Sequence, residues 1–401
     1  MKVSDIAYLC GYFSTTGNDI ESLLWENHFW TPDVHSSEET ALSARFYFPE
    51  FVDFSHEQVK TYRHECDKEI KVSMRDGSTR TAKLTDISVY LYPFGIVMYS
   101  IGVHQVDVPL CDALQVLMGL RMSFDASQTS DFVECAVKPL TELAGIAGAQ
   151  RLLESGNKFK VFHIVVADGE PAEQQEFDRL LFSAGTLTMY DPDDSMSFAE
   201  EYYQKIMAEG RLTVFRNWSA LALLDIFTIF SYSPKPFMLE IWTKDYFGKL
   251  YMYTLFRKFF LFRLNHLFRT QVAHISGLKK DMETFDRNYS FPVVSYNFLP
   301  ELVVHLMEDG FGIQEEKEKI SVMVNQEKER REAETGDKMN LFLGVISALT
   351  LFSAIWDFSC LMDGLFVFGD SIGTVTGFRA CTMLILGIIC LVVLLTRRFK
   401  R

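Results

Sequence analysis

The chain has 401 residues, and its 53 aspartates and glutamates outnumber its 39 lysines and arginines, which gives a formal net charge of −14. An acidic chain of this kind lacks the basic surface that nucleic acids require, so we expect no direct nucleic acid binding. Its seven cysteines include no CxxC pair, which argues against both a zinc site and a disulfide framework.

Two β-hairpins are predicted early in the chain. In the first, Asp76-Gly77 separates two alternating segments within residues 70–84, and an Asp-Gly pair is a strong hairpin signal. In the second, residues 84–103 fold back around Pro93-Phe94-Gly95 in the same manner. We therefore expect an antiparallel meander, followed by a helix over residues 108–124, where apolar side chains recur at helical spacing.

The next segment has the pattern of a strand followed by a helix. Residues 158–168 form an apolar, β-branched run of the kind that occurs in buried strands, and residues 171–184 then show helical spacing. A polar loop follows at residues 190–194. We therefore assign residues 1–195 to an α/β domain within a chain of the α+β class.

Residues 196–338 are predicted to be helical. Helical periodicity occurs in the segments 199–210, 217–230, 243–270 and 277–287. Residues 313–338 are rich in strong helix formers and carry opposite charges four residues apart, such as Glu315 and Lys319. Because no proline separates this charged run from the apolar residues after it, we expect one helix, a stalk that continues as a membrane span.

Two uncharged segments near the end of the sequence are long enough to cross a membrane. Residues 339–356 contain no Asp, Glu, Lys, Arg or His, and a helix of this length rises roughly 27 Å, close to the hydrocarbon thickness of a bilayer. Residues 380–396 are uncharged as well. We assign transmembrane helices to residues 339–358 and 379–396, an exterior loop to residues 359–378 and a basic tail to residues 397–401.

The basic residues predict the orientation of the spans. Four cations lie between Lys328 and Lys338 and four more in the tail 397–401, whereas residues 357–379, between the two uncharged runs, have three aspartates and a single arginine. The positive-inside rule then places both termini in the cytosol. No signal-peptide pattern follows Met1. We expect a multi-pass protein of the cell (inner) membrane with a cytosolic body.

The order of the predicted body, stalk and spans along the chain is informative. An α/β body and helices lead into a long stalk, which continues as the first of two spans joined by a short acidic loop. Lys338-Met339-Asn340-Leu341 and the tail Arg397-Arg398-Phe399-Lys400-Arg401 flank the spans. Both stretches are similar to the corresponding stretches of the CorA-type magnesium transporter superfamily, which the chain also resembles in architecture. The resemblance implies a homopentamer, with Mg2+ or another divalent cation as its ligand.

The sequence departs from this family at the outer end of the first span. The family carries Gly-Met-Asn at this mouth, where hydrated magnesium is recognised, whereas this chain has Trp356-Asp357-Phe358 and no Gly-Met-Asn anywhere. CorA-like proteins that lack the motif include membrane effectors of type III CRISPR antiviral defence. Resemblance to that branch implies that an adenylate second messenger opens or disrupts the membrane.

Small and polar side chains recur along one side of the first span. They are Asn340, Gly344, Ser347, Thr350, Ala354 and Asp357, at intervals of three or four residues. Around the axis of an oligomer this stripe would line a narrow pore, with asparagines at the cytosolic entrance and carboxylates at the exterior, where Asp363 and Asp370 would concentrate cations. The alternative is that the small residues mark close helix packing and that the three aspartates are solvated.

Residues 255–269 combine four cations with five phenylalanines in an otherwise acidic body. The cations are Arg257, Lys258, Arg263 and Arg269. They are candidates for holding a phosphate, with phenylalanines stacking on a base. The alternative is structural, because the three arginines are spaced six apart and do not share one helical face. In that case the cations neutralise acidic neighbours or extend to the surface.

The sequence carries no common catalytic motif, and we expect no enzyme. One hypothesis is a homo-oligomeric ion channel whose cytosolic body binds a small ligand, either a divalent cation, as in a magnesium transporter, or an adenylate nucleotide, as in the defence branch. The second hypothesis is a membrane-anchored scaffold whose acidic body recruits a soluble partner. In both cases the lipid bilayer is a partner of the chain.

Overall fold

The computed structural model describes residues 1–15, 20–26, 28–34, 36–73, 77–123, 130–149, 151–154, 156–270 and 275–366. The chain divides into two compact units, Met1–Ser321 and Val322–Arg401. The predicted second span, the basic tail, Asp370 and the Asp76 turn position lie outside the described residues. The first unit has a mixed α/β fold.

One nine-stranded sheet forms the centre of the first unit, in the order β2-β3-β4-β5-β1-β6-β9-β8-β7. Neighbouring strands are antiparallel except for β6 and β9, which are parallel. The strands are β1 (Lys2–Ser14), β2 (Thr31–Asp33), β3 (Lys60–Ser73), β4 (Thr79–Tyr92), β5 (Ile96–Pro109), β6 (Lys160–Ala167), β7 (Arg211–Phe215), β8 (Trp218–Leu223) and β9 (Ile226–Tyr232).

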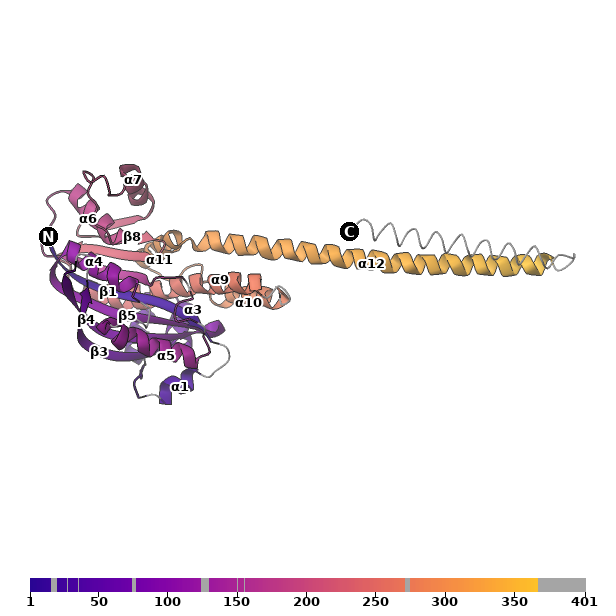
Figure 1. Cartoon of the computed structure of the whole chain (residues 1–401), viewed down its shortest axis with the longest axis horizontal. Helices are drawn as coiled ribbons and strands as arrows, with labels where there is room; N and C mark the ends of the chain where they lie inside the picture. Colours follow the sequence, from indigo (N-terminus) through magenta and orange to yellow (C-terminus); the bar gives the residue numbers. More distant parts are fainter. Residues whose placement is uncertain are drawn as a thin grey trace. The chain divides into compact units, whose positions relative to one another are not determined.

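Helices cover the sheet and connect its strands. In chain order they are α1 (Ile20–Glu26), α2 (Ser37–Ser43), α3 (Pro49–Asp53), α4 (Leu110–Arg121), α5 (Lys138–Ile146), α6 (Gln174–Thr186), α7 (Glu200–Glu209), α8 (Pro236–Glu240), α9 (Met252–Thr270), α10 (Ile275–Asn288), α11 (Phe298–Phe311) and α12 (Ile313–Phe366). The π-helical segment η4 (Ile241–Tyr251) joins α8 to α9, and α9 and α10 lie side by side (Figure 1).

Strand β1 is the central strand, and its two faces contribute to two different layers. Ala7 and Leu9 belong to the apolar core that β1 shares with α4, α5 and α6. On the opposite face, the ring of Tyr8 stacks on Phe247 of η4 at 3.7 Å, and the ring of Tyr12 stacks on Phe259 at 4.3 Å. Alternation of side chains along an extended strand therefore gives each helical layer its own set of β1 residues.

Several sequence predictions are confirmed. β3, β4 and β5 form the expected meander, and α4 lies within the helix predicted for residues 108–124. β6 and α6 are the predicted strand and helix, and the charged run and the apolar run belong to the single helix α12. The helix continues to Phe366, so residues 359–366 of the predicted exterior loop are helical.

The helix predicted for residues 217–230 is wrong, because this segment forms β8 and the first part of β9. Both strands are buried on both faces, with α6 on one side and with α11 and η4 on the other. Strands of this kind carry apolar residues without alternation, so their periodicity resembles that of a buried helix. The boundary predicted at residue 195 is wrong for the same reason, since β7, β8 and β9 complete the sheet.

Helix α12 contains the segment that can cross a membrane. In the described part of the chain, Thr335–Phe358 is the one helical stretch of sufficient length and apolar composition, with a mean hydropathy of 1.8, and none of it is buried inside the chain. A soluble domain normally buries such a stretch. The exposed apolar surface of α12 therefore indicates a membrane or other chains as its surroundings.

We predict that Gly310→Ala destabilises the protein by about 1–3 kcal/mol. Helix α11 approaches β8 so closely that a Cβ at residue 310 would lie 2.5 Å from the Cβ of Ala222 and 2.9 Å from its carbonyl oxygen. Thermal and denaturant unfolding of the detergent-solubilised chain measure the change.

The matched control is Gly145→Ala in α5, where a Cβ meets no atom within 4 Å. This variant removes a flexible helical glycine and is expected to stabilise the protein by about 0.5–1 kcal/mol. Equal effects of the two substitutions would contradict the close contact between α11 and β8.

Candidate functional site

The predicted pore-lining residues lie on α12 as the sequence spacing requires. Asn340, Gly344, Ser347, Thr350, Ala354 and Asp357 are all exposed in the single chain. The Thr350 hydroxyl donates to the backbone carbonyls of Ile346 at 3.0 Å and Ser347 at 2.9 Å, so its hydrogen bonds stay within the helix. Asp363 falls in the last turns of α12, beyond the stripe.

This arrangement places polar groups on an otherwise apolar, exposed helix. An asparagine amide or a carboxylate that faces hydrocarbon is costly, and such groups in membrane helices turn toward a neighbouring helix or a water-filled path. The stripe runs along one side of α12, and the large apolar side chains, such as Phe342, Leu349 and Phe352, are exposed elsewhere on it. The helix can therefore face lipid on one side and a polar axis on the other.

Arg257 on α9 is buried in the first unit, Met1–Ser321. Its guanidinium forms an ion pair with Glu308 of α11 and lies 5.4 Å from the ring centroid of Tyr253. Within the described residues, its Nε makes no hydrogen bond. Because burial of an unpaired charge is expensive, Arg257 and Glu308 depend on one another and hold α9 against α11.

Lys258 is also buried, with 4 % of its surface exposed. Its Nζ donates to the carbonyl oxygen of Leu224 at 2.7 Å and lies over the rings of Phe262 and Phe311 at 5.6 and 5.3 Å. Burial lowers the pKa of Lys258 to about 7, and repulsion from Lys160 adds to this effect. Lys258 therefore changes its charge near neutral pH.

The other two predicted ligand cations contact different partners. Arg263 is half-buried, and burial lowers its pKa although Asp281 and Glu154 oppose the shift. Arg269 is exposed and donates from Nε to Asn265 Oδ1 at 3.0 Å. The four cations thus interact with separate sets of groups, and α9 does not bring them together at one phosphate.

A second group of cations meets at the turn between β8 and β9, where Asp225 is largely buried. Arg121 Nη2 lies 3.1 Å from Asp225 Oδ2, Lys158 Nζ lies 2.6 Å from the same oxygen, and Lys160 forms an ion pair with Oδ1. The Lys258 ammonium lies on the carbonyl of the preceding residue, Leu224. We call Arg121, Lys158, Lys160, Lys258 and Asp225 the Asp225 cluster.

Opposing effects act on the charges of the Asp225 cluster. Burial alone raises the pKa of the Asp225 carboxyl, but Lys160 and Lys158 outweigh this and hold the pKa well below its usual range. Burial lowers the pKa of Lys160, and Lys158 and Arg121 add to the shift while Asp225 opposes it. The single carboxylate is therefore fully ionised and is shared by more positive charge than it balances.

The amino-acid sequence alone does not reveal this cluster. Lys158 and Lys160 begin the predicted strand, Arg121 ends α4, and Asp225 lies inside the segment that the periodicity predicts as a helix. Only the pairing of β6 with β9 brings Asp225 to the beginning of β6, where Val161 N donates to Asp225 O at 2.9 Å. A local pattern cannot reveal a contact of this range.

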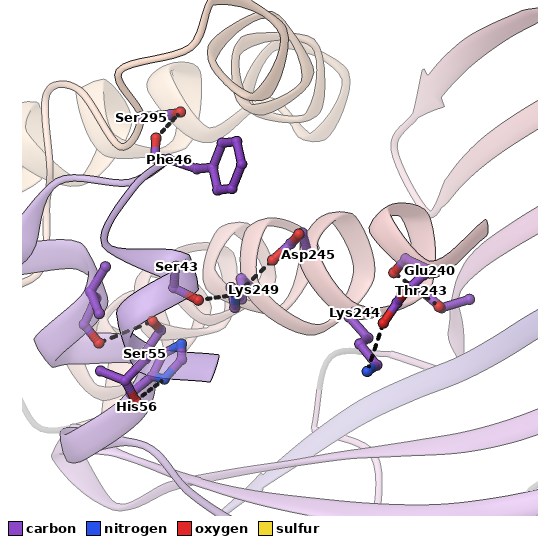
Figure 2. Close-up of polar contacts among 12 residues, drawn as sticks. Ser43, Phe46, Ser55, His56, Glu240, Thr243, Lys244, Asp245, Lys249 and Ser295 are labelled. Atoms are coloured by element: carbon purple, nitrogen blue, oxygen red, sulfur yellow. Dashed lines mark hydrogen bonds and ion pairs between the residues drawn. The ribbon is translucent and has the colours of Figure 1, made fainter. Parts of the chain in front are cut away.

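A third polar group joins α2 to η4. Figure 2 shows Lys249, whose Nζ donates to Ser43 Oγ at 2.7 Å and forms an ion pair with Asp245 at 2.6 Å. Nearby, Ser295 Oγ donates to the carbonyl oxygen of Phe46 at 2.6 Å (Figure 2). These bonds connect three segments that are distant in sequence, so their role is to fix the fold.

Comparisons with protein families, curated proteins and solved structures returned no match for this chain. Among the residues that the structure describes, no three His, Cys, Asp or Glu side chains are grouped so that they could hold a metal ion.

We predict that Arg257→Met lowers the free energy of unfolding by about 3–5 kcal/mol, because Glu308 is then left buried without its partner. The double variant Arg257→Met with Glu308→Leu should recover most of the loss, since it removes both charges. Denaturant unfolding of the full chain measures both.

Arg269→Met serves as the control, because Arg269 is exposed and its loss should change stability by less than about 0.5 kcal/mol. A double variant no more stable than Arg257→Met would show that Arg257 acts in some way other than through Glu308.

We predict that Lys258 makes stability depend on pH above neutrality. Its pKa is about 7 in the fold and 10.5 ordinarily, so between these values the unfolded chain binds more protons than the folded chain. Stability contributed by this residue therefore rises as the pH increases from about 7 to about 10. Unfolding midpoints measured across this range should rise less in Lys258→Met.

Lys279→Met is the matched control, because Lys279 is an exposed lysine in an ion pair with Glu283. It should leave the pH profile as it is in the wild type. An unchanged profile in Lys258→Met would mean that Lys258 keeps its proton throughout this range.

Proposed function

We propose that the chain forms a homo-oligomeric, CorA-like ion channel in the inner membrane, gated by a small ligand that binds its cytosolic body. The observation that carries this proposal is the polar stripe from Asn340 to Asp357 on an apolar stretch of α12, Thr335–Phe358, none of which is buried inside the chain. Copies of α12 around an axis would turn the stripe inward and the apolar side chains toward lipid.

Charge favours cations as the permeant ions. In such an assembly Asp357 forms a ring of carboxylates at the exterior end of the pore, and Asn340 forms a ring of amides at the cytosolic entrance. Carboxylate rings attract and select cations, whereas amide rings replace part of an ion's hydration shell. The resemblance to CorA-type transporters suggests five copies and two spans for each chain, and Mg2+ as one candidate ion.

The continuity of α12 supports gating from the body. The helix begins within the first unit at Ile313 and contains the candidate span without a break. Near its start, Asn265 of α9 donates to Glu316 at 3.0 Å. A ligand that binds one arrangement of α9 and α12 more tightly than another shifts the population of open channels.

A test of this function measures magnesium entry into sealed liposomes that contain the purified chain, before and after addition of a panel of adenylate messengers. Spontaneous entry that millimolar magnesium on the body's side stops would support a transporter with an altered mouth. Absence of magnesium entry until a nucleotide is added would support the ligand-gated effector of antiviral defence. Absence of flux under every condition would favour the membrane-anchored scaffold.

We predict that Ser347→Leu reduces ion flux severalfold, because a larger apolar side chain narrows the pore and excludes water from it. Asn340→Leu should act in the same direction, and Asp357→Ala should weaken the preference for cations. Flux from ion-loaded liposomes and reversal potentials in planar bilayers measure these effects.

Val345→Leu is the control, since Val345 lies two residues from Ser347, about half a turn around the same helix, and is exposed. It is expected to conduct like the wild type. Equal losses in Ser347→Leu and Val345→Leu, or no loss in either, would rule out the stripe as the pore lining.

A further inference from the structure

The Asp225 cluster carries more positive than negative charge. Three cations, Arg121, Lys158 and Lys160, contact one carboxylate, which leaves a net charge of +2 before Lys258 is counted. Lys160 and Arg121 are largely buried, with 7 % and 6 % of their side chains exposed. Buried charges are normally balanced by partners of opposite sign, so this excess is unusual in an acidic body.

Lys158 is the cation of the cluster with capacity to bind a ligand. It is 44 % exposed, and its ammonium has donors to spare beyond Asp225. Arg121 donates from Nε to the carbonyl of Phe159 at 3.0 Å, and its buried Nη2 is ion-paired with Asp225, so it contributes positive charge beside the ligand. An ammonium backed by further positive charge matches the oxygens of a phosphate group.

Solvent can reach this place. Asp225 and the exposed Leu224 form the turn between β8 and β9, and Lys158 precedes β6 beside them. The cluster therefore lies at an end of the sheet rather than in its interior. Lys158 is the cation of the cluster that an anion meets first from solvent, because Lys160 and Arg121 are largely buried.

We propose that the Asp225 cluster binds a phosphate group, with Lys158 as its hydrogen-bond donor and with Arg121, Lys160 and Lys258 supplying further positive charge. A phosphate dianion would neutralise the net charge of +2. This proposal deepens the proposed function, because it assigns the ligand site of the body, but phosphate binding can be measured independently of ion flux.

The position of Lys258 connects this site with α12. Its ammonium interacts electrostatically with Asp225, with Lys160 and with Glu316 near the start of α12. A phosphate beside Lys258 would favour the protonated amine and would compete with Glu316 for it. Occupancy of the site thus changes the forces on the first turns of α12, where Asn265 also contacts Glu316.

The experiment titrates inorganic phosphate into the detergent-solubilised full chain, with potassium chloride at equal ionic strength as the reference. Calorimetry and the thermal midpoint report binding, since a ligand of the folded state raises the midpoint as its concentration increases. Phosphate should raise it and chloride should not. Lys158→Gln should weaken phosphate binding about tenfold, as expected for the loss of one charge-assisted hydrogen bond.

Lys244→Gln is the matched control, because Lys244 is an exposed lysine in one ion pair, with Glu240, on η4 (Figure 2). It should bind phosphate like the wild type. Lys258→Met is the second variant and should also weaken binding. Equal phosphate affinity in the wild type, Lys158→Gln and Lys258→Met, or the same midpoint in phosphate and chloride, would overturn the proposal.

A second arm distinguishes the source of the phosphate. The chain is reconstituted in lipid nanodiscs with phosphatidate or with phosphatidylcholine, and the same midpoint is measured with and without free phosphate. A rise with free phosphate in both lipids identifies a soluble ligand, and a rise with phosphatidate alone identifies a lipid headgroup. In either case the rise of the midpoint must be lost in Lys158→Gln. Phosphate binding without any ion flux would support the phosphate site and contradict the ion channel.

Discussion

The internal hydrogen bonding of α12 is the constraint on which the rest of the molecule depends. Backbone amides and carbonyls in hydrocarbon must find their partners within the protein, and a continuous helix satisfies them without outside help. α12 meets this condition from Ile313 to Phe366 while its side chains change from charged to apolar near Lys338. The same backbone geometry can therefore exist in water and in a bilayer.

The body places its charges where this helix begins. α9 is anchored by the ion pair of Arg257 with Glu308 and by the hydrogen bond of Lys258 to Leu224, while Asn265 contacts Glu316. These bonds connect the sheet, α11 and α12 through one helix. A change in the charge of Lys258 therefore acts on the turn at Leu224 and, through its electrostatic interaction with Glu316, on the first turns of α12.

Local signals in the sequence predicted much of the fold. The strands of the β3–β5 meander, the β-branched run of β6 and the continuous α12 all depend on neighbours within a few residues, and all are confirmed. β8 and β9 were missed because helices cover both of their faces, so the alternation that identifies a strand is absent.

The candidate sites show the same division. The stripe on α12 follows from helical spacing alone, so the sequence was sufficient to place it on one side of the helix. The Asp225 cluster depends on the parallel pairing of β6 with β9 and on the end of α4. The local clustering of cations in residues 255–269 was a weaker guide, because Arg257 and Lys258 point to different partners.

The central place of β1 has a consequence for the folding rate. β1 pairs Lys2 with Pro109 on one side and Cys10 with Lys160 on the other, so both of its edges close long loops of chain. Contacts of such large sequence separation must overcome loop-closure entropy before they contribute stability, and proteins rich in them fold slowly. We therefore expect the meander β3–β5 to form early and β1 to insert late, which leaves the edges of β5 and β6 unpaired in the meantime and open to association with other chains.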